Sequence, residues 1–401
     1  MTRSKWHSLL LGAGATILAA SLMIYPQTSF DASLRGLSIW WEVVFPSLLP
    51  FIILSELLIA FGVVSFLGAF MEPFMRPLFK VPGTGGFVWA MGIASGYPAG
   101  AKLTTRLWSE KRITTIEAER LVSFTNSSNP LFLFGAIAVG FFHDPALGIV
   151  LAFAHYASNF VVGIMMRFHG KEEDSPSVVK DTRSLPSVRA AFQMLHEERL
   201  RDNRPIGQKL GDAVQSSVQT LLMIGGFIIL FSVLNEVLSL LNVTEALAML
   251  VGVFLYIFQF SSELSVPMVS GIFEMTLGSQ LASLTNAPLK QQVIVASFMI
   301  AFAGFSAQAQ AGSILAATDI RFKPFFIARC LQGCFAAIFT YLCWDWLYQP
   351  DGITVFTPWS EQSNGQKIWE TFLSLSPFFT LVMLILSIVI FHKRALRKVP
   401  K

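Results

Sequence analysis

The sequence contains one apolar pattern twice, and this duplication constrains the fold more than any other feature. Three landmarks recur in the same order: the tetrapeptide Phe-Ile-Ile-Leu, the pair Ser-Gly, and a polar interruption of an apolar run. They begin at positions 51, 95 and 124 in the first copy and at 227, 270 and 305 in the second. The offset stays at about 175 to 181 positions, so the match is collinear. A duplicated apolar unit with segments broken by Gly, Pro and amides is typical of a secondary transporter.

Composition places the chain in a membrane. Hydrophobic residues make up 53% of the 401 residues, charged residues make up only 13%, and Phe alone occurs 37 times. A soluble protein of this length needs far more polar surface. We therefore predict an all-α polytopic membrane protein, an inverted-repeat transporter with about eight transmembrane helices and two re-entrant hairpins.

The predicted spans are apolar runs long enough to cross roughly 30 Å of hydrocarbon. They lie at about 8–25, 40–62, 119–142, 146–168, 213–241, 291–314, 324–347 and 371–391. Two further apolar stretches, 83–108 and 264–287, contain Gly and Pro near their middles. We interpret them as re-entrant hairpins with bends at 95–98 and 269–271, because protein or a water-filled cavity can satisfy a broken backbone at membrane depth.

The distribution of positive charge predicts the orientation. With these spans, every Lys and Arg except Arg35, Lys290 and Lys367 lies on a segment predicted to be cytoplasmic. The positive-inside rule favours this arrangement, in which both termini are cytoplasmic. The two Phe-Ile-Ile-Leu segments then lie on the second and the fifth span, three crossings apart, and an odd number makes the repeats inverted. The basic start, with Arg3 and Lys5, also resembles a signal peptide, but we interpret it as an uncleaved first span.

The domain prediction follows from these spans and from the charged segment between the repeats. The boundaries are 1–37 for a peripheral first helix and loop, 38–168 for repeat one, 169–212 for a charged cytoplasmic linker, 213–347 for repeat two, and 348–401 for a loop and last transmembrane helix. We expect a short helix at about 188–200 in the linker, and interfacial segments at 72–77 and at 246–260.

The strongest local signal is the tip of the first hairpin. The candidate binding residues there are Ser95, Gly96, Tyr97, Pro98, Gly100 and Lys102. Glycine permits tight geometry and Pro98 starts a new helix, so the free N–H groups of a half-helix would point into the protein and bind an anion. The ammonium of Lys102 would then contact a substrate carboxylate. The alternatives are that the small residues only allow close helix packing, and that Lys102 only anchors the hairpin at the headgroups.

A second set of candidates consists of amides and hydroxyls inside apolar runs. They are Asn126, Ser127, Ser128 and Asn129 in repeat one, and Ser306, Gln308 and Gln310 in repeat two. Gly271, at the bend of the second hairpin, is a further candidate. Pro130 cannot donate to a carbonyl one turn back, so we expect the helix to unwind around Asn126. Amides and hydroxyls bind a ligand without the cost of a buried charge. They could instead serve only interhelical hydrogen bonds.

Acids within the membrane form the third set. Glu56, Glu236 and Glu274 are candidates for ion or proton coupling, because buried carboxylates are costly and usually mark such pathways. For Glu56, an ion pair with a nearby Lys or Arg is an equal alternative. We interpret Arg329 as an end residue whose side chain reaches the headgroups. Enzyme motifs are missing, so we predict no catalytic residue, no metal and no cofactor.

These motifs resemble a known family. The segments 38–62, 95–102 and 124–134 are similar to those of the YlbJ family of sporulation integral membrane proteins from endospore-forming bacilli, also called SpoVV, and the similarity covers nearly the whole chain. That family carries the nucleoside-recognition Gate domain and resembles concentrative nucleoside transporters. The nucleoside-binding motifs Asn-Glu-Phe and Glu-Ala-Pro have no convincing equivalent here, so the binding residues of those transporters are not carried over.

The resemblance implies a function. It suggests export of dipicolinate from the mother cell across the outer forespore membrane, with a small anion and the lipid bilayer as partners, no nucleic acid, and a possible homo-oligomer. The alternatives are a Gate-type scaffold for a partner protein, as Gate domains serve beside a GTPase in iron transport, and a nucleoside-like carrier.

Overall fold

The computed structural model describes residues 3–170, 188–202 and 204–349, and among them all regular secondary structure is helical. The predicted all-α class is therefore confirmed. The first part of the chain contains α1 (Arg3–Ile24), α2 (Pro26–Ser38), η1 (Ile39–Val44), α3 (Phe45–Ala60), α4 (Val63–Phe79), α5 (Thr84–Ser95), α6 (Ala99–Ser109), α7 (Thr115–Thr125), η2 (Leu131–Phe141) and α8 (Leu147–Met166).

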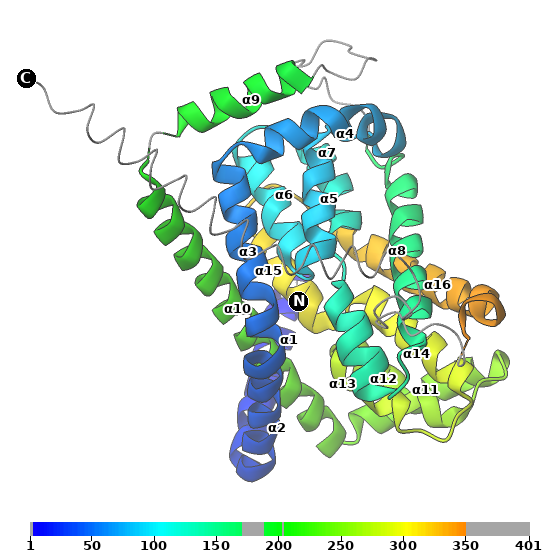
Figure 1. Cartoon of the computed structure of the whole chain (residues 1–401). Helices are drawn as coiled ribbons and strands as arrows, with labels where there is room; N and C mark the ends of the chain where they lie inside the picture. Colours follow the sequence, from blue (N-terminus) through cyan, green and yellow to red (C-terminus); the bar gives the residue numbers. More distant parts are fainter. Residues whose placement is uncertain (1–2, 171–187, 203, 350–401) are drawn as a thin grey trace, which may run out of the picture. The chain divides into compact units, whose positions relative to one another are not determined.

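The second part repeats this order. It contains α9 (Val188–Arg201), α10 (Ile206–Leu240), α11 (Val243–Ile257), η3 (Ser262–Leu264), α12 (Ser265–Phe273), α13 (Met275–Ser283), α14 (Leu289–Phe302), α15 (Gly304–Leu315) and α16 (Phe322–Leu347). The predicted linker helix is present as α9. Helices α3, α4, α5 with α6, α7 with η2, and α8 correspond in order to α10, α11, α12 with α13, α14 with α15, and α16. Figure 1 shows the equivalent helices α4 and α11 at opposite ends of the bundle, as inverted repeats require.

Each repeat turns a sharp corner after its first long helix. Segments 48–60 and 63–79 meet at 85°, and Gly62 between them has φ of 79°. At the equivalent corner Asn242 has φ of 55°. Both residue types tolerate the left-handed conformation, which explains why the chain can leave the helix abruptly there. The predicted interfacial segments 72–77 and 246–260 thus fall mostly on α4 and α11, the helices that follow these corners.

The two predicted hairpins are present, and the bend of the second lies later than expected. Helices α5 and α6 are separated by 96–98, as predicted. Helix α12, in contrast, continues through Gly271 to Phe273, and the chain bends at Glu274. The prediction of a bend at 269–271 is therefore wrong. The Glu274 carboxylate accepts hydrogen bonds from the backbone N–H groups of Thr276 and Leu277, so it starts α13 as an N-cap.

Two predicted spans are broken within the membrane. Helix α7 ends at Thr125, and the chain resumes as η2 only after Pro130. Helix α14 ends at Phe302, where Ala303 and Gly304 both have positive φ. Among the described residues four helical segments, 147–166, 206–240, 289–315 and 322–347, are long and apolar enough to cross a membrane, or five if the bent pair α3–α4 is one span. The predicted span 371–391 lies outside the described residues.

The two main apolar cores each combine both repeats. One contains Phe79 and Phe124 of the first repeat with Leu315 and Phe325 of the second. The other contains Leu133 of η2 together with residues of α8 and of α11 to α14. The hairpins and broken helices are therefore held in one packed unit.

Candidate functional site

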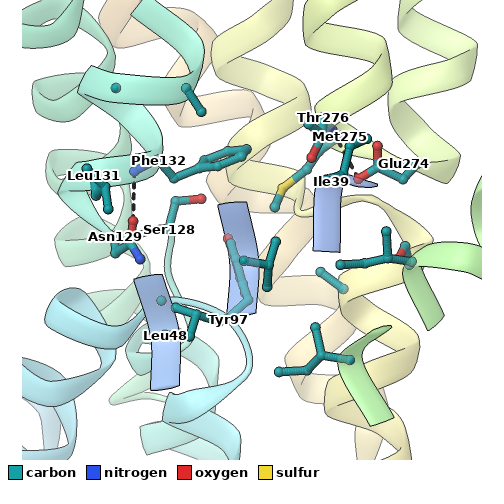
Figure 2. Close-up of a pocket in the computed structure, with 18 of the residues that line it drawn as sticks. Ile39, Leu48, Tyr97, Ser128, Asn129, Leu131, Phe132, Glu274, Met275 and Thr276 are labelled. Atoms are coloured by element: carbon teal, nitrogen blue, oxygen red, sulfur yellow. Dashed lines mark hydrogen bonds between the residues drawn. The ribbon is translucent and has the colours of Figure 1, made fainter. Parts of the chain in front are cut away.

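A cavity of about 700 Å³ lies where the two hairpin tips and the two broken helices meet. Figure 2 shows Tyr97 of the first tip and Glu274, Met275 and Thr276 of the second among its lining residues. Helices α3 and α10 contribute Leu48, Ile224 and Ile228. A cavity of this size, apolar with a few polar groups, suits a small organic ligand.

Seven of the predicted site residues line this cavity. They are Gly96, Tyr97, Ser128, Asn129, Glu274, Ser306 and Gln310. The first and the last of them lie more than 200 positions apart in the sequence, so the folding of the two repeats brings these predicted residues together. Their location is established by the structure, and their role in binding stays a prediction.

Asn129 holds the first tip against the broken helix. Its Oδ1 accepts a hydrogen bond of 2.8 Å from the backbone N–H of Phe132, and its Nδ2 donates to the Ser95 carbonyl at 3.4 Å. Gly96 has φ of 83°, and a Cβ atom built there would lie 3.3 Å from Asn129 Nδ2. Glycine at this position therefore serves both the backbone conformation and the close approach.

Three predicted residues at or near the tips are packing positions and do not line the cavity. A Cβ atom at Gly100 would lie 2.2 Å from the Thr125 carbonyl oxygen, and one at Gly271 would lie 1.9 Å from Met299 Sδ. Pro98 precedes α6 as its N-cap residue, next to the cavity-lining Tyr97. The packing interpretation thus accounts for Gly100 and Gly271.

A buried polar region lies behind the cavity, around the end of α7. Asn126 and Ser127 are fully buried, and their side chains make no hydrogen bond. The backbone N–H of Ser128 donates to Nε2 of His155 at 2.9 Å, and the Ser128 carbonyl accepts from Tyr156 at 3.0 Å. Asn126 and Ser127 therefore face this buried region, while Ser128 and Asn129 reach the cavity.

Arg329 enters the same region from α16. It is fully buried, and its Nη1 donates to the Asn126 carbonyl at 2.7 Å while its Nη2 donates to the Ser123 carbonyl. The prediction that Arg329 reaches the headgroups is wrong. The unwinding of α7 leaves its last carbonyls without helical partners, and the guanidinium satisfies them. The run of polar residues at 126–129 was the only sequence signal for such a partner.

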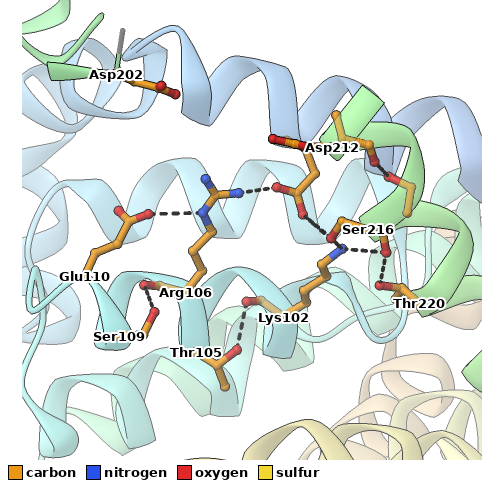
Figure 3. Close-up of polar contacts among 12 residues, drawn as sticks. Lys102, Thr105, Arg106, Ser109, Glu110, Asp202, Asp212, Ser216 and Thr220 are labelled. Atoms are coloured by element: carbon orange, nitrogen blue, oxygen red, sulfur yellow. Dashed lines mark hydrogen bonds and ion pairs between the residues drawn. The ribbon is translucent and has the colours of Figure 1, made fainter. Parts of the chain in front are cut away.

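Lys102 does not face the cavity. Its Nζ lies 2.9 Å from Oε1 of Glu56 and 3.0 Å from Oγ of Ser216. Arg106, one turn further along α6, also pairs with Glu56 and with Glu110. Figure 3 shows Lys102 and Arg106 extending from α6 toward this cluster. Lys102 therefore forms an ion pair with Glu56. For Glu56 the structure shows the alternative given above, an ion pair with nearby cations.

The other two predicted acids are in different surroundings. Glu236 pairs with Arg35 of α2 at 2.5 Å and is partly exposed. Glu274 is 7% exposed and lines the cavity, and its carboxylate accepts hydrogen bonds from the backbone N–H groups of Thr276 and Leu277. Gln308 also points away from the cavity, because its Nε2 donates to the Phe302 carbonyl at the break before α15.

The sequence analysis missed part of the lining. Phe132, Met275 and Thr276 line the cavity next to predicted residues, and Glu42 lines it from η1. Acids and neutral polar groups are present in the lining, whereas Lys, Arg and His are not. The described residues contain no group of three or more His, Cys, Asp or Glu side chains suited to a metal ion.

Comparison with known proteins agrees with this description. The fold and cavity define a transporter-like integral membrane protein, and residues 41–145 match the Gate family model, described as nucleoside recognition. The chain is 53% identical to the sporulation integral membrane protein YlbJ of Bacillus subtilis (strain 168) over 409 aligned positions, which cover 98% of each chain. The chain therefore belongs to the YlbJ family of sporulation membrane proteins, and the predicted family is confirmed.

A solved structure shows weaker similarity. A CNTnw variant in an outward-facing state aligns with 82% of this chain and 85% of its own, at 13% identity and a TM-score of 0.42. Such values are too low to infer a shared function.

Proposed function

We propose that this protein is an alternating-access carrier for a small planar dicarboxylate. The observation that carries the proposal is the position of the cavity, which is enclosed by hairpin tips from both repeats and by both broken helices. Discontinuous helices around a central cavity are the usual construction of a secondary-transporter site. A small movement of either tip would change access to the same cavity.

Dipicolinate is the substrate that fits this proposal best. It is a flat ring with two carboxylates, and the sporulation family to which the chain belongs favours a spore-specific solute. Tyr97 and Phe132 offer aromatic surface, while the hydroxyls of Ser128, Ser306 and Thr276 are hydrogen-bond donors. We propose that the protein lies in the outer forespore membrane, with both termini cytoplasmic, and moves dipicolinate out of the mother cell.

Glu274 is the acid that we propose for proton coupling. Of the three candidates, Glu56 and Glu236 have basic partners, whereas Glu274 lines the cavity with no basic partner among the described residues. A carboxylate beside a bound dianion is unfavourable unless it takes up a proton. Protonation of Glu274 would therefore accompany binding of the dianion.

A nucleoside-like ligand is the second candidate. The match of residues 41–145 to the nucleoside-recognition model supports it, as do the neutral and acidic groups of the lining. Glu42 and Glu274 can accept hydrogen bonds from ligand hydroxyls, a contact that a dicarboxylate cannot supply.

Reconstitution of the purified protein into liposomes tests the proposal. Liposomes loaded with terbium, whose luminescence rises when dipicolinate binds, should report entry of dipicolinate faster than liposomes without protein. Unlabelled dipicolinate should compete with labelled dipicolinate, whereas uridine should not. Flux no faster than in empty liposomes would exclude dipicolinate, and saturable uridine uptake would establish the nucleoside-like alternative.

A further inference from the structure

Arg329 is a buried cation without a buried anion to neutralise it. The side chain is fully buried in α16, and among the described residues no carboxylate forms an ion pair with it. The ring of Phe325 lies 5.5 Å from the guanidinium carbon. A charge in such a place is costly, and membrane proteins keep it mainly where it has a function.

The partner of this cation is the end of a broken helix. Ser123 and Asn126 present their carbonyl oxygens to the guanidinium at the C-terminal end of α7. A helix C-terminus carries partial negative charge, so it stabilises a cation there. It supplies about half an elementary charge, however, so a net positive charge remains in this region.

The same carbonyls are the groups that bind a dissociable cation in many carriers. In transporters built from broken helices, the unwound carbonyls and C-terminal ends of half-helices commonly coordinate the coupling Na⁺. In this protein a guanidinium occupies them. The guanidinium therefore takes the place of a dissociable cation at the end of α7. The carbonyls of Ser123 and Asn126 both accept hydrogen bonds from it, so neither is free to bind a metal ion.

The cation also lies next to the cavity. The Asn126 carbonyl that accepts from its Nη1 lies two positions before Ser128, which lines the cavity. Among the described residues the lining contains no Lys, Arg or His, so it offers an anion no full positive charge. The positive potential that a dicarboxylate needs must come from behind the lining, and Arg329 is placed to supply it from the end of α7.

We infer that Arg329 is a tethered cation that replaces a coupling Na⁺ at the broken helix α7 and supplies the positive charge for an anionic substrate. This inference rests on the proposed function for the identity of the anion. Its statement about Na⁺ is independent of the substrate. Arg329 is a positioning residue in this scheme, because it acts through the α7 backbone without lining the cavity.

Thermal unfolding of the purified protein tests the statement about Na⁺. A ligand that binds only the folded state raises the unfolding midpoint, by a few degrees or more when it is well above its Kd. We expect the wild-type midpoint to be the same in sodium chloride and in choline chloride at equal ionic strength. A midpoint that rises with Na⁺ and not with choline would overturn the inference, and this measurement needs no transport assay.

Substitutions test the statement about charge. Arg329→Gln should raise the Km for dipicolinate about tenfold or more, and Arg329→Lys should give an intermediate value. Lys323→Gln, which removes a positive charge from the exposed start of α16, should leave the Km unchanged.

The outcomes separate this inference from the proposed function. If wild-type protein transports no dipicolinate, the proposed function fails and the Na⁺ comparison still decides the inference. If dipicolinate is transported and Arg329→Gln has the same Km as Lys323→Gln, the inference fails and the proposed function stands. Should the Arg329 variants not fold, a Na⁺ requirement for wild-type transport would still overturn the inference, and transport in choline would support it.

Discussion

The Nζ atom of Lys102 lies 2.9 Å from Oε1 of Glu56, so hairpin one is joined to α3 by a nearly buried ion pair. Arg106 contacts the same carboxylate, and Ser216 of α10 donates to it at 3.3 Å. One acid thus connects the second helix of the hairpin to two long helices. If this hairpin moves relative to α3 in the proposed transport cycle, the pair must separate.

The ion pair predicts unequal effects of its two partners on stability. Glu56→Gln removes the carboxylate that pairs with Lys102 and leaves Arg106 with Glu110 alone, whereas Lys102→Gln leaves Glu56 paired with Arg106. We expect Glu56→Gln to lower the free energy of unfolding by about 3 kcal/mol and Lys102→Gln by less. Chemical unfolding in detergent measures both values. A Lys102→Gln variant with normal stability and a raised substrate Km would show that the ammonium contacts the substrate after all.

Close packing at the first hairpin tip predicts that one added methyl group lowers the stability of the protein. Gly100→Ala should cost about 1 to 3 kcal/mol of stability, because its Cβ would lie 2.2 Å from the Thr125 carbonyl oxygen. Gly226→Ala is the matched control, since nothing lies within 4 Å of a Cβ there. The unfolding midpoints of the two variants should differ clearly. Equal midpoints would contradict the close contact between α6 and the end of α7.

The two asparagines of the broken helix should give different phenotypes. Asn129 lines the cavity, and Asn126 is fully buried behind it. Asn129→Ala should therefore raise the substrate Km about tenfold with a smaller change in protein level. Asn126→Ala should leave the Km unchanged. Transport kinetics measured alongside membrane abundance distinguish the two, and identical kinetics would refute the placement.

Glu274 predicts a pH dependence. If Glu274 must be protonated before the dianion can bind, a lower pH favours transport. Wild-type uptake should therefore increase as the pH falls, within the range in which dipicolinate stays a dianion. Glu274→Gln keeps the size of the side chain and removes the titratable group, so its uptake should be independent of pH in that range. Uptake by Glu274→Gln that keeps the wild-type pH profile would assign the coupling to another group.

The inverted repeats predict the sides of two exposed turns. Lys111 follows hairpin one and Gln259 follows α11, near opposite ends of the bundle. In a background without Cys330, Cys334 and Cys343, the variants Lys111→Cys and Gln259→Cys should react with an impermeant thiol reagent from opposite sides. Reaction from the same side would contradict the inversion.

The sequence predicted the architecture because the repeat is visible in apolar periodicity and in backbone-breaking residues. Gly96 with Pro98, and Pro130, mark breaks that chain sterics require, and the structure has breaks at these positions. The bend of the second hairpin was misplaced because it depends on Glu274 capping α13, a side-chain contact that no backbone propensity announces.

The candidate site was predicted less completely. Seven of the predicted residues line the cavity because polar side chains in apolar segments turn inward. The roles of Lys102 and Arg329 depended on which helices pack together, and sequence spacing contains no such information. Lys102 sits beside Glu56, 46 positions earlier, and Arg329 sits beside Asn126, 203 positions earlier. Arg329 lies only about one turn inside the predicted span 324–347, which is why its side chain was predicted to reach the headgroups.

The contact between Arg329 and Asn126 has a consequence for the history of the chain. Arg329 belongs to the second copy of the duplicated unit, and the helix end that it completes belongs to the first. The corresponding helix of the first copy, α8, contains no Lys or Arg at all. The two copies therefore have different roles at this contact, because one provides the guanidinium and the other provides the carbonyls. Either half produced alone would have an unfinished helix end or a buried charge without its acceptors, so we expect neither half to fold without the other.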